Sequence, residues 1–408
     1  MTLITVAAVA IFLATYFVMA LGRLPGFQLD RAGAALLGAA LMVGVGVLSP
    51  GEAFAAIDAA TIALLLGMMV VVANLRLSGF FHLLTEWVGH HARHPLLLLA
   101  GVVVVTGVLS AFLVNDAVCL AVTPLVSDVL LRLRRDPLPY LLAVAMASNA
   151  GSVATITGNP QNMIIGSLSG IPYLHFAIAL TPVAVVALVV VWAVIVVVHR
   201  RDFVGAPPVA VADDTPLVYH RALVIKTVIV LALMVVAFFL GAPVSEVAVL
   251  GGAYLLLTRR VKPDKVYGSI DWPLLVMFAG LFVVVAGLEK AVLGPRAIAA
   301  IGGLNLAAVP VLAVATAALS QLVSNVPAVL VLRPFVAPLA DPTRAWLVVA
   351  MASTLAGNFT IVGSVANLIV VQQARAAGIA ISFWRYFAVG APVTLITLAF
   401  GIFWLGWA

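Results

Sequence analysis

Two short polar segments interrupt apolar stretches and carry residue types suited to binding a small solute. TITGNPQN (155–162) and TIVGSVAN (360–367) place glycine and asparagine inside runs that are otherwise apolar. In a bilayer, non-helical backbone is tolerated only where protein or a water-filled cavity covers it. Asn159 followed by Pro160 predicts an N-cap and the start of a half-helix, whereas the second segment has serine and valine there, a weaker cap. The free N–H groups at such a start favour an anion or a polar solute.

A second pair of polar positions, Asn115-Asp116 and Ser324-Asn325, lies in the middle of two longer apolar stretches. Asp116 is one of few acidic residues well inside an apolar stretch, and a carboxylate at bilayer depth is by default a functional hypothesis. In one interpretation it binds and releases a proton in each transport cycle. In the other it caps the helix that follows by accepting a backbone hydrogen bond. We favour the coupling role.

The composition excludes most other classes of protein. The 408 residues are 64% hydrophobic and 9% charged, with a mean hydropathy of +1.24, whereas a soluble domain is about 25% charged. The basic residues are scattered singly, which favours a membrane protein over a nucleic-acid binder. The single cysteine, Cys119, excludes an intramolecular disulfide and a cysteine-based metal cluster. His90, His91 and His94 lack nearby carboxylates, so we predict no metal site, and the absence of a P-loop motif argues against direct use of ATP.

Apolar segments of about 20 residues are long enough to cross the bilayer core as helices. Clear candidates lie near 2–21, 32–49, 58–75, 174–198, 221–241, 244–257, 272–288 and 384–407. We interpret 95–132 and 305–340 as re-entrant hairpins, and 138–170 and 344–371 as single spans with an interruption. An amphipathic helix at the interface is expected over 81–94.

The distribution of basic residues supports this topology. With two re-entrant hairpins, 17 of the 21 Lys and Arg residues, Arg31 among them, fall on one face. The excess of basic residues places that face in the cytoplasm. The sequence therefore predicts about ten spans in the cell (inner) membrane, with both termini outside.

The two halves of the chain repeat each other. Three pairs of segments match in the same order, at offsets of 213, 210 and 205 residues: 57–75 with 270–288, 113–126 with 323–336, and 143–165 with 348–370. An odd number of spans separates equivalent elements, so the repeats are inverted in the membrane, as in many secondary transporters. Gly67 and Gly280 occupy matching positions, which we interpret as sites of close helix packing.

The predicted fold is thus an all-α polytopic membrane protein built from inverted repeats. Its predicted parts are a first repeat over 1–171, a linking span with a cytoplasmic linker over 172–220, a second repeat over 221–376 and a C-terminal span over 377–408.

The segments LVNDAVCLAVTPLV, SNAGSVATITGNPQN, LVSNVPAVLVLRP and MASTLAGNFTIVGSVAN resemble signature segments of the ion transporter superfamily. That group includes ArsB-type arsenite permeases, plant-type silicon effluxers, NhaD-type Na⁺/H⁺ antiporters and divalent anion/Na⁺ symporters. The hairpin tip and the GNPQN loop look more like the arsenite and anion permease branch. The resemblance implies a scaffold and a transport domain, an elevator movement, a homodimer, and H⁺ or Na⁺ as the coupling ion with no other cofactor.

The resemblance also implies which residues contact the solute and the ion. Asp116 carries the ion-coupling role, and Na⁺ has a candidate site at Asn115 and Asn325. The implied substrate contacts are Asn115, Ser148, Asn149, Thr157, Asn159, Asn162, Ser324, Asn325, Ser353, Thr354, Asn358 and Asn367, and the unwound loops add Gly158, Thr360 and Gly363.

The leading functional hypothesis is proton-coupled export of a small inorganic oxyacid or oxyanion, of the arsenite or silicic acid type. Its basis is a site rich in amides and hydroxyls, with one carboxylate and without a buried Arg or Lys, which suits a neutral hydroxylated solute. The alternatives are Na⁺-coupled symport of an anion such as sulfate, phosphate or a carboxylate, and Na⁺/H⁺ antiport. A membrane-embedded enzyme is disfavoured because no Ser/His or His/Asp constellation falls within the spans.

Overall fold

The computed structural model describes residues 3–22, 26–91, 94–203, 219–257, 261–292 and 305–407, and every regular element within these ranges is helical. Seven helices are long and apolar enough to cross a membrane: α1 (Leu3–Leu21), α4 (Ala59–Ser78), α6 (Pro95–Phe112), α10 (Tyr173–Val198), α12 (Arg221–Phe239), α15 (Trp272–Val292) and α21 (Phe383–Trp407). The protein is therefore a multi-pass membrane protein.

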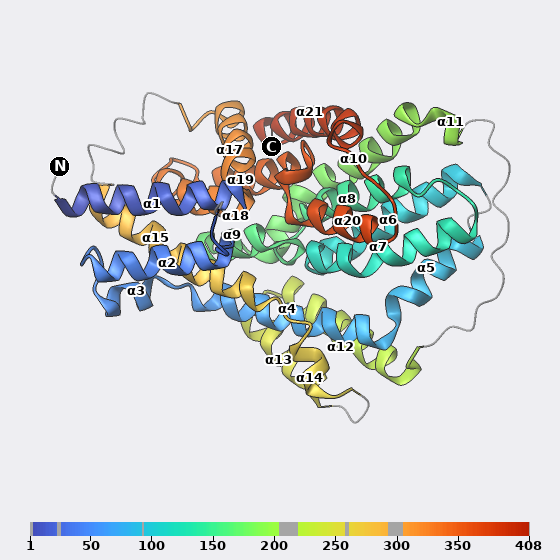
Figure 1. The fold of residues 1–408 in the computed structure, drawn as a ribbon, viewed down its shortest axis with the longest axis horizontal. Helices are drawn as coiled ribbons and strands as arrows, with labels where there is room; N and C mark the ends of the chain where they lie inside the picture. The colour runs from blue at the N-terminus through green and yellow to red at the C-terminus, as the bar shows by residue number, and fades with distance from the viewer. Residues whose placement is uncertain are drawn as a thin grey trace.

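Eight helices form what we call the frame group, in two bundles of matching design. One bundle packs α1, α2 (Arg31–Gly44) and α15 together, with α3 (Pro50–Ala56) against α15. The other packs α12, α13 (Val244–Leu256) and α4 together, with α14 (Pro263–Tyr267) against α4. The bundles lie at the left and at the lower centre of Figure 1. Each bundle thus combines helices from both sequence repeats, so neither repeat completes its share of the frame alone.

Glycine permits the closest helix contact in each bundle. A Cβ atom on Gly67 would lie 2.4 Å from the carbonyl carbon of Ala248 in α13, and one on Gly280 would lie 2.6 Å from that of Ala35 in α2. Small residues allow helix backbones in membranes to approach this closely. The packing interpretation of both glycines is confirmed, and the two contacts are related by the same offset of 213 residues.

The remaining long elements form what we call the hairpin group, which contains two helical hairpins, two broken helices and the helices α10 and α21. Its two helical hairpins are α6 with α7 (Asn115–Arg132) and α17 (Val309–Val323) with α18 (Asn325–Val336). The arms of the first hairpin lie to the right of the centre in Figure 1, and those of the second to the upper left. Both tips reach one central cavity, so the hairpins approach each other from opposite sides and meet. α5 (Phe80–His91), within the predicted amphipathic segment, packs against α7.

Both interrupted spans are broken helices, as predicted. In the first repeat α8 (Leu138–Ser152) ends, a single 3₁₀ turn η1 (Ile156–Gly158) follows, and α9 (Pro160–Ser169) begins. In the second repeat α19 (Pro342–Ala356), η2 (Ile361–Gly363) and α20 (Val365–Ala376) follow the same order. α10 and α21 pack on each other and cover α8 and α19, respectively. The short α11 (Arg200–Phe203) follows α10.

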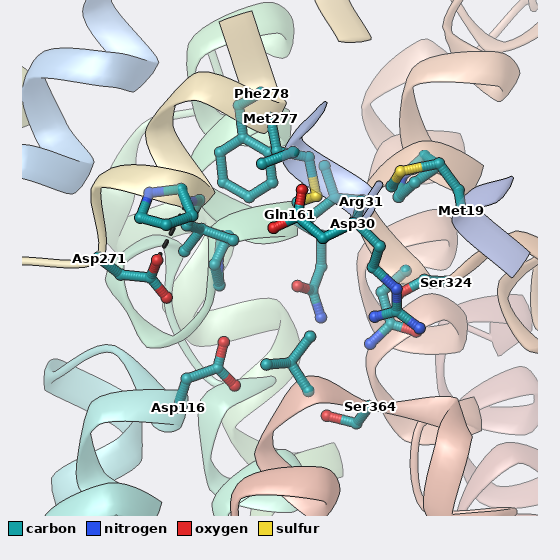
Figure 2. Close-up of a pocket in the computed structure, with 18 of the residues that line it drawn as sticks. Met19, Asp30, Arg31, Asp116, Gln161, Asp271, Met277, Phe278, Ser324 and Ser364 are labelled. Carbon is teal, nitrogen blue, oxygen red and sulfur yellow. Dashed lines mark hydrogen bonds between the residues drawn. The ribbon is translucent and has the colours of Figure 1, made fainter. Parts of the chain in front are cut away.

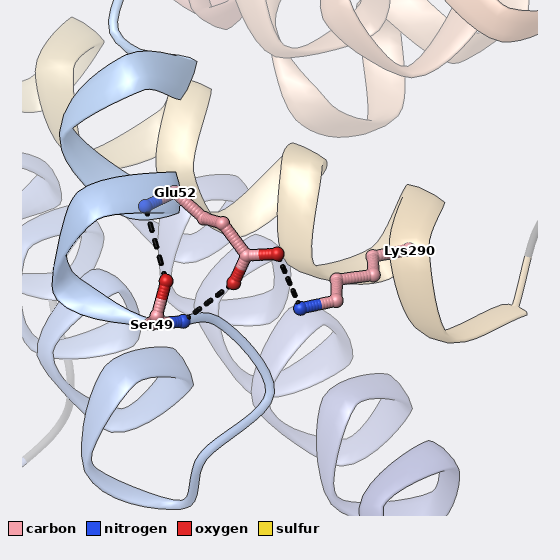
Figure 3. Close-up of polar contacts among 3 residues, drawn as sticks. All are labelled: Ser49, Glu52 and Lys290. Carbon is pink, nitrogen blue, oxygen red and sulfur yellow. Dashed lines mark hydrogen bonds and ion pairs between the residues drawn. The ribbon is translucent and has the colours of Figure 1, made fainter.

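A polar contact joins α3 to the end of α15 (Figure 3). Ser49 and Glu52 form a capping box, in which the Ser49 N–H donates to Glu52 Oε2 at 2.7 Å and the Glu52 N–H donates to Ser49 Oγ at 3.2 Å. Lys290 Nζ donates to Glu52 Oε1 at 2.6 Å. The hydrogen bond from Lys290, followed by that from the Ser49 backbone, lowers the pKa of Glu52 to about 2.

Candidate functional site

A cavity of about 200 Å³ lies where the two groups of helices meet. The hairpin group lines it with the tips of both hairpins and the starts of both half-helices, α9 and α20. The frame group lines it with the end of α1, the start of α2 and the first turns of α15. Figure 2 shows polar side chains from both groups pointing into the same space. The site is therefore composite, with walls from both sequence repeats.

The two hairpin tips present an asparagine each. Asn115 Nδ2 donates to Asn149 Oδ1 at 3.1 Å, while Asn115 Oδ1 is buried without a hydrogen-bond partner. The Asn325 amide nitrogen donates to the carbonyl oxygens of Ser353 at 3.0 Å and Gly363 at 3.2 Å. Each tip is thus tied to a broken helix, the first through a side chain and the second through backbone.

Ser324, at the second tip, has φ +77° and ψ 161°. This backbone region is essentially restricted to glycine, so an L-residue there is strained by about 1–3 kcal/mol. The strain lies directly at the cavity wall, where the helix direction reverses.

Asp116 lies in the first turn of α7, on the cavity side of the first tip (Figure 2). Its helix has Val114 as N-cap and no side-chain capping hydrogen bond. The Asp116 carboxylate instead accepts a hydrogen bond from the backbone N–H of Ala366, in the first turn of α20, so Asp116 caps α20 rather than its own helix. Asp116 and Asp271 also line a second, smaller cavity of about 80 Å³, whose wall includes Arg76 and Ser269. The Asp116 carboxylate thus lines both cavities while it also holds the start of α20.

The predicted start of the first half-helix is confirmed. Asn159 caps α9, since its side chain accepts a hydrogen bond from the Asn162 N–H at 2.9 Å, and Pro160 occupies the first helical position. In the second repeat Ser364 makes no capping hydrogen bond to α20, and it donates to Asn149 Oδ1 at 3.1 Å instead. The weaker cap predicted there is confirmed as well.

One asparagine in each repeat holds the unwound loop together. Asn162 Nδ2 donates to the carbonyl oxygens of Ser152 and Thr155, each at 3.0 Å. Asn367 Nδ2 donates to the equivalent carbonyl oxygens, of Gly357 at 2.7 Å and Thr360 at 3.1 Å. Carbonyls at an interrupted helix end need such partners because no water reaches them in the bilayer core. Both amides therefore position the loops from behind the cavity.

Amide and hydroxyl groups also join the two repeats to each other. Asn149 Nδ2 donates to Asn358 Oδ1 at 2.9 Å and to Asn367 Oδ1 at 3.1 Å. Thr354 Oγ1 accepts hydrogen bonds from Asn159 Nδ2 at 3.2 Å and Gln161 Nε2 at 3.1 Å. These side chains are buried, and buried hydrogen bonds of this kind hold the broken helices in one relative position.

The remaining predicted residues also lie behind the cavity wall. Ser148 Oγ accepts a hydrogen bond from Cys119 Sγ at 3.0 Å and donates to the Ala145 carbonyl at 2.8 Å. Further bonds join Thr157 to the Tyr173 hydroxyl, Ser353 to the Ala350 carbonyl and Thr360 to Gln321 Oε1. A Cβ atom would lie 2.3 Å from the Ser152 carbonyl oxygen at Gly158 and 2.7 Å from Gln321 Nε2 at Gly363. Of the predicted residues, only Asn115, Asp116, Ser324 and Asn325 line the cavity, and direct solute contact by the others stays a prediction.

The cavity also contains residues that sequence reasoning missed, above all Arg31, with Asp30, Gln161, Asp271 and Ser364. The expectation of a single carboxylate is wrong, because Asp30 and Asp271 line the cavity together with Asp116. Arg31, at the start of α2, also lines the cavity, with a partly exposed side chain. Gln161 belongs to the GNPQN segment, which the sequence had already indicated as part of the site, although Gln161 itself was not predicted. Nothing local distinguished Arg31 from the other basic residues, since its position depends on how α2 packs against α1 and α15.

Within the described residues, no group of three or more His, Cys, Asp or Glu side chains could hold a metal ion. His94 caps α6 by accepting a hydrogen bond from the Leu96 N–H at 3.3 Å. The side chains of His90 and His91 lie outside the described part of the chain.

Inverted repeats, paired hairpins and broken helices around one polar cavity define a polytopic membrane transporter of the ion transporter superfamily. A family model described as "Citrate transporter" (CitMHS) matches residues 14–345, and the chain belongs to this family. It is 33% identical to a 46 kDa membrane protein of Mycobacterium leprae, with 98% of each chain covered. It is 30% identical to the silicon efflux transporter LSI3 of Oryza sativa subsp. japonica, with 93% of each covered.

The fold has a solved counterpart. The YdaH transporter of Alcanivorax borkumensis superposes with a TM-score of 0.62 over 99% of this chain and 98% of that one, at 17% sequence identity. At this identity the likeness shows the fold alone.

Proposed function

We propose that this protein is a secondary transporter of a small oxyacid or oxyanion, of the arsenite or silicic acid type, that exports its solute by coupling to protons. The observation that carries the proposal is the cavity between the two hairpin tips, into which Asp116 projects beside amide and hydroxyl groups. Amides and hydroxyls both donate and accept hydrogen bonds, which matches a solute covered with hydroxyl groups. The similarity to a silicon efflux transporter supports the same class of solute.

Asp116 is the proposed proton carrier. It comes from the first hairpin tip, makes no cap for its own helix and faces the cavity. An ionisable group within the membrane that faces a cavity is suited to a proton relay. Protonation in one state and release in the other would link solute movement to the proton gradient.

An elevator movement is the proposed mechanism. The cavity lies at the boundary between the frame group and the hairpin group, and within the hairpin group the two repeats are joined by buried amide contacts. A body held together in this way can move as a unit against the frame. We further propose a homodimer in the inner membrane with both termini outside, as the basic residues and the superfamily resemblance imply.

Na⁺-coupled anion symport is a second candidate, and two observations favour it. Arg31 brings a guanidinium to the cavity, which suits an anionic solute. The oxygen of the Asn115 amide is buried without a partner, and amide oxygens are ligands that a hard cation accepts. Under this candidate Na⁺ binds at the tips, near Asn115 and Asn325.

Flux into proteoliposomes under separate gradients tests the proposal. We expect arsenite or silicic acid to move when a pH gradient is imposed, and Asp116→Asn to abolish that movement while the protein remains folded. The matched control is Asp128→Asn, on the same helix, where the carboxylate is exposed and paired with Arg132 at 2.8 Å. Flux driven only by a sodium gradient would refute proton coupling and favour the second candidate. Unchanged pH-driven flux in Asp116→Asn would refute the role of Asp116.

A further inference from the structure

Arg31 is a cation without a protein partner at the cavity wall. It is the first residue of α2, and its Nε atom is buried and makes no hydrogen bond. No ion pair to Arg31 is found among the residues that the structure describes. The buried Nε of Arg31 lacks a compensating acceptor, and an unsatisfied buried donor costs free energy. Such a group persists in a transporter when a solute supplies the acceptor.

The acidic residues of the cavity form no ion pair with Arg31. Asp30 caps α2 by accepting from the Gly33 N–H at 2.8 Å, and Asp271 accepts from the Leu274 N–H at 3.0 Å at the start of α15. Both carboxylates are therefore engaged by backbone N–H groups at helix starts, where the helix dipole also favours negative charge. Asp116 and Asp271 lie on one side of the cavity, and Arg31 lies on the other, beside Ser324 (Figure 2).

The cavity is thus polarised, with a cationic end at Arg31 and an acidic end at Asp116. The planar guanidinium offers N–H donors in a fixed geometry that matches two oxygens of one oxyanion. The carboxylate at the other end accepts a hydrogen bond from a hydroxyl group. A solute that satisfies both ends carries a negative oxygen and a hydroxyl group on the same small centre.

We propose that Arg31 binds the anionic oxygens of the transported solute, and that the solute is a partly protonated oxyanion whose remaining hydroxyl faces Asp116. This inference rests on the proposed function and narrows its solute from oxyacids in general to singly charged species. A fully ionised oxyanion lacks the hydroxyl donor, and a neutral oxyacid lacks the charge that Arg31 requires. Both are expected to bind more weakly.

The second repeat offers no substitute for Arg31. The contacts of Gly67 with Ala248 and of Gly280 with Ala35 relate α2 to α13 by 213 residues, which places Val244 at the position equivalent to Arg31. Arg31 also belongs to the frame group, whereas Asp116 belongs to the hairpin group. Any movement between the groups separates the two ends of the cavity and weakens the hold on the anion.

Calorimetric binding to the purified full chain tests the inference with three probes. Inorganic phosphate at mildly acidic pH carries one charge and hydroxyl groups, sulfate carries charge without a hydroxyl, and silicic acid carries hydroxyl groups without charge. We expect phosphate to bind more tightly than the other two. Loss of a charge-assisted hydrogen bond predicts that Arg31→Gln weakens phosphate binding about 10- to 100-fold, while Arg31→Lys retains part of the affinity.

Arg385→Gln is the matched control. Arg385 is an exposed arginine near the start of α21 that lines neither cavity, so its loss is expected to leave phosphate affinity unchanged. The thermal unfolding midpoint of Arg31→Gln should equal or exceed that of the unaltered protein, because an unpaired cation is removed. A lower midpoint would indicate a structural role and overturn the inference.

Two further outcomes also overturn it: phosphate that fails to bind, and phosphate affinity that is unchanged in Arg31→Gln. The proposed function is tested separately. If silicic acid or arsenite flux depends on Asp116 and not on Arg31, the proposal of proton-coupled oxyacid export is retained. The inference that Arg31 binds an anion is then refuted. Absence of flux for every oxyacid and oxyanion under a pH gradient would remove the proposed function itself.

Discussion

Substitution of Asn162 by alanine separates a loop-holding role from a solute-binding role. The side-chain nitrogen of Asn162 donates one hydrogen to the Ser152 carbonyl and the other to the Thr155 carbonyl, each at 3.0 Å. Both acceptors are buried backbone groups beside the break between α8 and α9. The substitution removes both donors at once and leaves the backbone of α9 intact.

The expected loss of stability depends on which hydrogen bonds the Ser152 and Thr155 carbonyls keep after the substitution. The Ser152 carbonyl retains a hydrogen bond from Asn159 Nδ2 at 3.3 Å, whereas the Thr155 carbonyl retains only a long contact from the Gly158 N–H at 3.4 Å. Two lost hydrogen bonds of about 0.5–1.5 kcal/mol each, with one buried carbonyl left nearly unsatisfied at about 1–3 kcal/mol, give about 2–6 kcal/mol in total. Asn367→Ala, at the equivalent position, is expected to fall in the same range.

Two measurements on the purified protein check this prediction. The unfolding free energy should fall by the stated amount, and hydrogen exchange should rise in peptides that cover the loop between α8 and α9. The control is Gln372→Ala on the exposed surface of α20, where a substitution is expected to change stability by about 0.5 kcal/mol or less. Unchanged stability and exchange in Asn162→Ala, together with weakened solute binding, would refute the loop-holding role and restore Asn162 as a solute contact.

Three more predictions concern packing, backbone strain and charge. Gly67→Ala should destabilise the protein by about 1–3 kcal/mol, because the new Cβ atom would lie 2.4 Å from the backbone of α13. Gly44→Ala, where the space around the glycine is open, should leave the stability unchanged. Thermal unfolding of both variants tests the prediction. Ser324→Gly should stabilise the second hairpin by about 1 kcal/mol by relieving φ +77°, and an unchanged or lower midpoint would contradict the strain argument. The stabilisation that Glu52 contributes should be complete above about pH 4.5 and lost as the pH falls toward 2, because Lys290 lowers the pKa of the Glu52 carboxyl group. In the Glu52→Gln variant, the free energy of unfolding should depend less on pH in that range.

The broken helices and hairpin tips were predictable because their signals are local. An Asn-Pro pair inside an apolar run leaves few conformations other than an N-cap followed by proline at the first helical position, and the structure has that cap at Asn159. The comparison between repeats predicted Gly67 and Gly280 as packing positions, since side-chain size is what the matched positions share. The breaks and tips therefore follow from short stretches of sequence and from their repetition.

The composition of the site was harder to predict because it depends on contacts between distant elements. Asn162 and Asn367 are the residue types expected in a binding site, yet their donors satisfy carbonyls of their own loops. The sequence alone does not show whether an asparagine amide donates its hydrogen bonds to a solute or to a backbone carbonyl. Arg31 presents the opposite case, because it resembles an ordinary loop cation. It reaches the cavity through the packing of α2 on α1 and α15, which in turn contact the second hairpin.

The inverted repeats have matching packing but unmatched charge, and this difference bears on coupling. The frame contacts at Gly67 and Gly280 correspond closely. Two conformations in which each repeat takes the position held by the other can therefore have similar free energies. The charged groups do not correspond: Val326 stands where the first repeat has Asp116, and Val244 stands where it has Arg31. One carboxylate at the hairpin tips and one guanidinium on the frame group give the proposed cycle one proton site and one anion site. Introducing Asp at Val326 would add a second proton site, and we expect the proton-to-solute ratio, measured by flux at equilibrium potentials, to rise. An unchanged ratio in a folded and active Val326→Asp variant would show that the tip carboxylate does not set the coupling.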